Sequence, residues 1–117
     1  MKVVFVAGKY RDSRGEYYVI QNIREAEKIA LFIWAHGGVA VCPHMNTRFL
    51  GGVLPDETWL KGNLELIRRC DALYRMENAH MSEGAKTEIR LAKTLGMPVL
   101  EGFAPLRNYI CTRVRHE

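Results

Sequence analysis

The sequence predicts a single α/β domain in which a parallel β-sheet is covered by helices on both faces. Strand-like and helix-like segments alternate along the chain, which is typical of parallel strands joined by crossover helices. The first strand is a nearly continuous apolar run, as expected for a strand buried on both faces. With 117 residues, 48% of them hydrophobic, the chain has the size and composition of one globular domain.

Four short apolar segments predict the strands, at residues 2–7, 39–42, 72–76 and 97–101. Three helices are predicted where apolar residues recur every three or four positions: from Ile20 or Asn22 to His36, over residues 56–69, and from the turn at 82–84 to Gly96. In the first helix the inward-facing set is Ile23, Ala26, Ala30, Ile33 and Trp34. Asp56 is a candidate N-cap of the second helix.

Right-handed crossovers and the chain order favour a doubly wound sheet of four to five strands in the order 2-1-3-4. Ligands bind such sheets beyond the carboxyl ends of the strands, so the loops after the strands should surround one site. The loop over residues 44–55 is long enough to suggest a functional role. The segment 103–117 is expected to be a tail of the same domain as residues 1–102, as a strand, a short helix or an arm onto a neighbouring subunit.

Composition excludes several classes of protein. The net charge of +4 suits a phosphate-bearing ligand, but the basic residues are dispersed and no nucleic-acid-binding motif is present. No apolar stretch approaches the ~18 residues of a membrane span, and the apolar start of the chain is too short for a signal peptide. We therefore expect a cytoplasmic protein. No zinc spacing, Walker loop, dinucleotide fingerprint or Ser-His-Asp order occurs, so neither a metal nor a cofactor is expected.

Glu88 occupies an unexpected position in the third predicted helix. At ~100° per residue, it falls inside the arc formed by Ala85, Ile89, Leu91, Ala92 and Leu95. A buried carboxylate is costly unless partnered, and such groups concentrate in functional sites. The alternative is structural, because the helix dipole favours an acid in the first turns.

Asn63 repeats this pattern in the second predicted helix. It projects between Trp59, Leu66, Ile67 and Cys70, so an amide also points toward the sheet or the site beside it. The alternative is a core asparagine bonded to the backbone.

Two loops are candidates for holding phosphate. The helix that starts at Ser82 offers free backbone N–H groups, and Gly84 allows a close approach. The loop after the first strand combines Gly8 with the cations Lys9 and Arg11. Both loops should converge on Glu88.

His44 follows the second strand at the same edge of the sheet. It could stack on or hydrogen-bond a base, or merely cap the strand end.

Four stretches carry a resemblance to a known group: "VFVAGKYR", "CPH", "L-x-x-I-x-x-C-D-A-L" and "S-E-G-A-K-T-E-I-x-x-A-x-x-L-G-M-P-V". Together they resemble the nucleoside 2-deoxyribosyltransferase superfamily over about residues 2–101. The similarity is closest to small phage and bacterial members of unassigned function and to the 2'-deoxynucleoside 5'-phosphate N-hydrolases. The resemblance implies a flavodoxin-like (Rossmann-like) three-layer fold and a homodimer.

The resemblance also implies roles. The nucleophile of the family lies in the pattern G-x-x-x-E-[IL]-G-x-A, which places it at Glu88 with Gly84 as the matching glycine. Ser82 matches the phosphate-binding serine of the monophosphate hydrolases. Gly8 and Arg11 match their "G-S-x-R" loop, in which Lys9 replaces the serine.

Asn63 departs from the family, because both enzyme types carry a proton-donating aspartate at that place. In this interpretation Tyr10, His44 and Asn63 contact the sugar or base.

The first hypothesis is therefore cleavage of the N-glycosidic bond of a (deoxy)nucleoside 5'-monophosphate, by hydrolysis or by transfer. The second is a nucleotide-binding or sensing module of the same fold that has lost its acid. A third is a phosphoribohydrolase with a "G-G-x-G-T-x-x-E" loop, which "SEGAKTE" fits poorly because it lacks the paired glycines.

Overall fold

The computed structural model describes residues 1–46, 50 and 52–112 of the chain. Its sheet contains β1 (Val3–Ala7), β2 (Val39–Val41), β3 (Ala72–Arg75) and β4 (Val99–Leu100). All the pairings are parallel and the order is β2-β1-β3-β4. The structure confirms the α/β class and the strand order that the sequence predicts.

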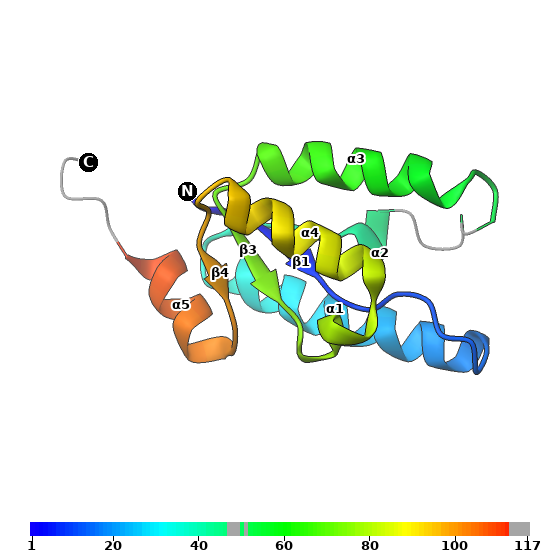
Figure 1. Cartoon of the computed structure of the whole chain (residues 1–117). Helices are drawn as coiled ribbons and strands as arrows, with labels where there is room; N and C mark the ends of the chain where they lie inside the picture. The colour runs from blue at the N-terminus through cyan, green and yellow to red at the C-terminus, as the bar shows by residue number, and fades with distance from the viewer. Residues whose placement is uncertain (47–49, 51, 113–117) are drawn as a thin grey trace.

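Helices cover both faces of this sheet, as Figure 1 shows. The described helices are α1 (Glu16–Ala35), the short α2 (Pro43–Asn46), α3 (Asp56–Arg68), α4 (Glu83–Thr94) and α5 (Phe103–Cys111), with a 3₁₀ helix η1 (Glu77–Met81) before α4. The chain thus forms the three layers expected of a doubly wound fold.

The central strand β1 explains why there are two hydrophobic cores. Successive side chains of a strand point to opposite faces. Val4 and Val6 therefore join the core that contains residues of α1 and α5, while Phe5 and Ala7 join the core beneath α3 and α4. These four side chains have no exposed surface. An apolar run without alternation is what a strand buried on both faces requires.

The first helix differs from its prediction at its start and at one residue. It begins at Glu16, directly after Gly15, rather than at Ile20 or Asn22. Its first turn carries Tyr17 and Tyr18, which are exposed and so give no apolar periodicity. Trp34, predicted to face inward, is 55% exposed.

The start of α3 also differs from the prediction. Asp56 is the first helical residue, Pro55 holds the N-cap position and no side chain caps the helix. The Asp56 carboxylate lies in the first turn, where the helix dipole favours an acid, and it pairs with Arg11.

Part of the predicted loop over residues 44–55 is helical, because α2 begins at Pro43. Residues 47–49 and 51 lie outside the described residues.

The segment after β4 is a short helix, which decides between the three alternatives for residues 103–112. Leu106 and Ile110 of α5 are buried in the core shared with α1. Tyr109 donates a hydrogen bond to the carbonyl of Asp71, 3.4 Å away. Residues 113–117, the end of this segment, lie outside the described residues.

Among the described helices, none combines the length and the apolar character that crossing a membrane would require.

Candidate functional site

A cleft of about 560 Å³ opens beyond the carboxyl end of β1. Its walls come from four places: the loop after β1, α2, the first half of α3, and the junction of η1 with α4. This is where a doubly wound sheet is expected to hold a ligand. The volume lies in the range of ordinary small-molecule sites.

Glu88 of α4 lines this cleft while being almost entirely buried, with 6% of its surface exposed. Ala85, Ile89 and Ala92 of the predicted apolar arc are buried beside it, whereas Leu95 at the end of the helix is 48% exposed and does not belong to the inner face. Burial raises the pKa of the Glu88 carboxyl to about 8, and a hydrogen bond from the Asn63 side chain acts in the opposite direction. Protonated and ionised forms of Glu88 are therefore both accessible near neutral pH.

Asn63 of α3 brings the second unusual polar side chain into the same cleft. It is half-buried, and the partner of its side chain among the described residues is Glu88. An amide can donate a hydrogen bond to a carboxylate but has no titrating proton. Asn63 can thus orient Glu88 and favour its ionised form, but it cannot act as a general acid.

Ser82 and Gly84 lie at the start of α4 and also line the cleft. The Ser82 Oγ caps the helix by accepting a hydrogen bond from the backbone N–H of Ala85, 3.1 Å away. A Cβ added at Gly84 would meet only the Ser82 Oγ, at 3.8 Å. The start of α4 therefore leaves open space beside Gly84.

Gly8 differs from Gly84, because packing against a neighbouring side chain leaves no room for a Cβ at position 8. A Cβ at this position would lie 2.2 Å from the sulfur of Met76, the residue that follows β3. Two side chains cannot share that volume. The glycine at the end of β1 therefore has a structural reason to be there, independent of any ligand.

Lys9 and Arg11 behave differently from each other. Lys9 is not among the described residues that line the cleft, and its ammonium group pairs with Asp12 at 3.1 Å. Arg11 lines the cleft and pairs with Asp56 of α3 across its mouth. Both partners are largely exposed, so this pair is replaceable by a ligand at small cost.

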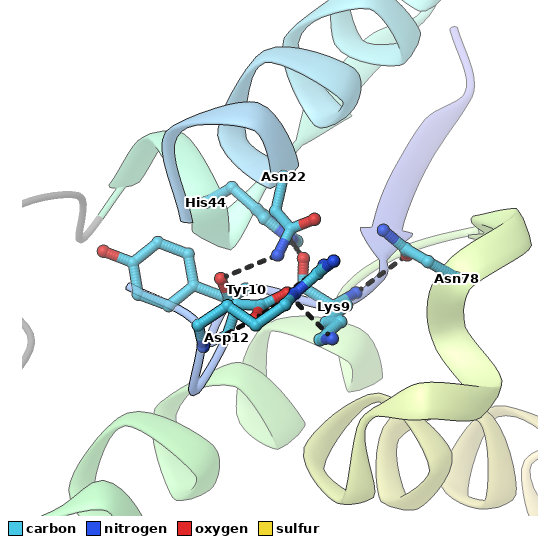
Figure 2. A network of polar contacts seen from close by, with 7 residues as sticks. Lys9, Tyr10, Asp12, Asn22, His44 and Asn78 are labelled. Atoms are coloured by element: carbon cyan, nitrogen blue, oxygen red, sulfur yellow. Dashed lines mark hydrogen bonds and ion pairs between the residues drawn. The ribbon is translucent and has the colours of Figure 1, made fainter. Parts of the chain in front are cut away.

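A buried carboxylate organises the loop after β1 (Figure 2). The Asp12 side chain, 3% exposed, accepts hydrogen bonds from Lys9, from the backbone of Arg14 and from its guanidinium group. Hydrogen bonds from Arg14 hold the pKa of Asp12 well below its usual range. The backbone N–H of Lys9 donates to Asn78, and the Asn22 amide donates to the Tyr10 carbonyl. The loop that carries Tyr10 and Arg11 is thus tied to α1 and η1.

Tyr10 and His44 lie together in the cleft wall, with ring centroids 5.7 Å apart and planes at 82°. The His44 Nε2 is 2.9 Å from the Lys9 carbonyl (Figure 2), which can only accept, so this nitrogen carries the hydrogen. Nδ1 is then a bare acceptor, and it is buried with no hydrogen-bond partner among the described residues. Burial lowers the pKa of His44, which favours the neutral ring.

The cleft also contains residues that the sequence did not identify as functional. Trp59 was assigned to the apolar face of its helix, yet it lines the cleft, and its buried indole N–H has no partner in the part of the chain that the structure describes. Acidic side chains at the mouth come from Asp56, Glu57 and Glu83. Apolar contacts are added by Leu60 and Met81. Helical periodicity placed Trp59 beside Asn63, but it cannot separate a cleft wall from a core.

No cluster of three or more histidine, cysteine, aspartate or glutamate side chains suitable for a metal ion occurs in the part of the chain that the structure describes.

Comparison with known proteins agrees with this architecture. The family model of a domain of unknown function, DUF7768, matches residues 2–101. A search of curated proteins finds no match. The fold is similar to that of a 2-deoxyribosyltransferase from the psychrotolerant bacterium Bacillus psychrosaccharolyticus, with a TM-score of 0.65 and 17% sequence identity. That match covers 85% of this chain and 70% of the other. The sequence resemblance to the deoxyribosyltransferase superfamily is thereby confirmed as a likeness of fold.

Proposed function

We propose that this chain, which belongs to the DUF7768 family of domains of unknown function, cleaves the N-glycosidic bond of a (deoxy)nucleoside 5'-monophosphate with Glu88 as the nucleophile. The observation that carries the proposal is the buried Glu88 carboxyl, held by Asn63 in the cleft at the carboxyl edge of the sheet. The similarity of fold to a 2-deoxyribosyltransferase supports the same chemistry. By the family resemblance, the proposal includes a homodimer in the cytoplasm.

The chemical step begins with an ionised Glu88. Its carboxylate attacks C1 of the sugar as the bond to the base breaks, and the oxocarbenium-like state collapses to a glycosyl ester. Water, or a second base, then attacks C1 and releases Glu88. Because burial raises the pKa of Glu88 to about 8, only a minority of the molecules carries the ionised nucleophile at pH 7. The amide of Asn63 favours that form.

The departing base needs a proton, and the described residues of the cleft offer few donors. Asn63 has no titrating proton. The acidic side chains that line the cleft, Asp56, Glu57 and Glu83, lie at its mouth, and the ring hydrogen of His44 is directed at the Lys9 carbonyl. These observations favour water as the proton source, and therefore a slow reaction or a base that leaves easily.

The monophosphate is proposed to bind between Arg11 and the first turn of α4. The N-terminal N–H groups of a helix attract phosphate, and Ser82 and Gly84 lie there without bulk. Arg11 would exchange Asp56 for the phosphate and gain a bidentate partner. Lys9 supports this loop through Asp12 instead of reaching into the cleft.

A second candidate function is nucleotide binding without turnover. It is favoured by one observation, the amide of Asn63 at the place where the leaving base would need an acid. The cleft would then serve as a sensor, with Glu88 protonated and able to donate a hydrogen bond to a ligand.

One experiment separates the two functions. The protein is incubated with a panel of nucleoside and deoxynucleoside monophosphates, and free base is measured by chromatography, with Glu88→Gln and Glu88→Ala in parallel. The first function predicts base release that both variants abolish. Release that persists in both variants would exclude Glu88 as the nucleophile. A monophosphate that raises the melting temperature without any base release would establish the binding module instead.

A further inference from the structure

A second hollow, of about 220 Å³, lies on the outer side of α4, away from the cleft. Its lining residues are Arg75, His80, Lys86, Ile89, Arg90 and Lys93. At 100° per residue, Lys86, Arg90 and Lys93 lie roughly opposite Glu88 on the helix. One helix therefore separates a cleft rich in carboxylates from a hollow whose polar lining side chains are all basic.

The basic side chains around this hollow come from three elements, and three of them are held by the following contacts. Arg75 at the end of β3 pairs with Glu101 at 2.9 Å. The His80 ring in η1 donates from Nδ1 to the Glu77 carbonyl, 3.0 Å away. The Arg90 guanidinium donates to the Thr87 hydroxyl at 3.1 Å. Because these contacts already order the side chains, less conformational entropy is lost when an anion binds.

Of the four described lysine and arginine side chains at the hollow, two are paired with carboxylates and two are not. Lys86 pairs with Glu83 at 3.3 Å, but among the described residues no carboxylate pairs with Arg90 or Lys93. The floor is formed by Ile89, which is buried. A concave surface lined by charges of one sign over an apolar floor concentrates counter-ions.

We propose that this hollow binds a chain of two or three phosphoryl groups, either inorganic or at the end of a nucleotide. From Lys86 to Lys93 the helix rises about 10 Å, which a single phosphate cannot span. Arginine binds phosphoryl oxygens in a bidentate manner, and Arg75 and Arg90 lie at different elements of the rim.

The lining favours recognition of phosphate over recognition of a base. No tyrosine, phenylalanine or tryptophan is among the described lining residues, so a base would find no stacking surface apart from the His80 ring. The same feature disfavours single-stranded nucleic acid. The inference is independent of the reaction proposed for the cleft.

The test is a calorimetric titration of the whole protein with orthophosphate, diphosphate and tripolyphosphate at fixed ionic strength. Affinity should rise along that series. The double variant Arg90→Gln/Lys93→Gln should weaken tripolyphosphate at least tenfold. The matched control, Arg24→Gln/Lys28→Gln on the exposed face of α1, removes the same net charge and should leave the affinity unchanged. Equal weakening by both double variants would overturn the proposal, because net charge alone would explain it.

Two further arms fix the place and the source of the phosphates. Arg11→Ala and Glu88→Gln alter the cleft and should leave tripolyphosphate binding intact; a loss there would put the anion in the cleft and overturn the proposal. A nucleoside triphosphate should bind like tripolyphosphate. Tighter binding of the nucleotide, or of a DNA oligonucleotide, that Arg90→Gln/Lys93→Gln abolishes would replace phosphate recognition by base or nucleic-acid recognition.

Discussion

The carboxyl group of Glu88 on α4 is hydrogen-bonded by the side-chain amide of Asn63 on α3, inside the cleft. Two helices from distant parts of the sequence thus bring together an acid with a raised pKa and a neighbour that cannot titrate. The pair combines a nucleophile with an orienting group and omits the general acid that cleavage of an N-glycosidic bond requires. The properties of this pair lead to two predictions.

Replacing Asn63 by aspartate should increase the rate of base release. Two carboxyl groups in contact share a proton near neutral pH, so one is ionised while the other can donate. A positioned acid contributes about 10²-fold or more, and we expect at least about tenfold at pH 6 to 7. The measurement is base release from the best monophosphate of the panel.

The control is Asn46→Asp, which makes the same charge change at an exposed position of α2. It should leave the rate unchanged. If Asn63→Asp folds normally and is no faster than the parent protein, the lack of an acid at position 63 does not limit base release. The binding function would then gain support.

Replacing Glu88 by glutamine should stabilise the protein at high pH. The folded pKa of about 8 lies above the ordinary value of 4.5, so the folded state binds a proton that the unfolded state releases between those values. Stability is therefore lost as the pH rises, by about 1.4 kcal/mol per pH unit over that range. Glutamine keeps the shape and has no charge to bury.

Urea denaturation at pH 5 and pH 9 measures this effect. The two proteins should have nearly equal unfolding free energies at pH 5, and Glu88→Gln should be the more stable by several kcal/mol at pH 9. Because other groups titrate alike in both proteins, the difference isolates Glu88. An advantage independent of pH would show that burial does not perturb this carboxyl.

The burial of Glu88 could be predicted because a helix repeats every 3.6 residues, which places position 88 inside an apolar arc whatever the surroundings. The strand order followed equally from apolar runs and from the handedness of crossovers. Both are periodic or chain-wide properties, and the sequence carries them directly.

The direction of Lys9 could not be predicted, because it depends on a non-periodic loop. Its ammonium group is held by Asp12, a buried carboxylate of the same loop. The role of Trp59 was missed for a different reason, since a cleft wall and a core present the same apolar periodicity. The start of α1 was missed because its first turn buries nothing.

Arg11 and Asp56 should have opposite effects on monophosphate binding. Arg11→Ala removes a charge-assisted contact worth about 1.5 to 3 kcal/mol, so monophosphates should weaken about tenfold or more while nucleosides change little. Asp56→Asn frees Arg11 from an exposed pair worth about 1 kcal/mol at most, so monophosphates should bind up to about fivefold more tightly. Titration of matched nucleosides and monophosphates checks both. Equal changes for both ligand types would place the phosphate elsewhere.

Gly8 should be required for stability whether or not it approaches a ligand. In Gly8→Ala the new methyl group would lie 2.2 Å from the Met76 sulfur. Because β1 and β3 are paired in the sheet, their backbones are held, and the Met76 side chain would have to move. Overpacking of this kind costs about 1 to 3 kcal/mol.

Gly62→Ala is the matched control, because its methyl group meets nothing within 4 Å and it lies inside α3. That control should gain about 0.5 to 1 kcal/mol, since alanine is the better helix former. Urea denaturation without any nucleotide measures both. A Gly8→Ala protein as stable as the parent but unable to bind monophosphate would show that this glycine serves the ligand and not the packing against Met76.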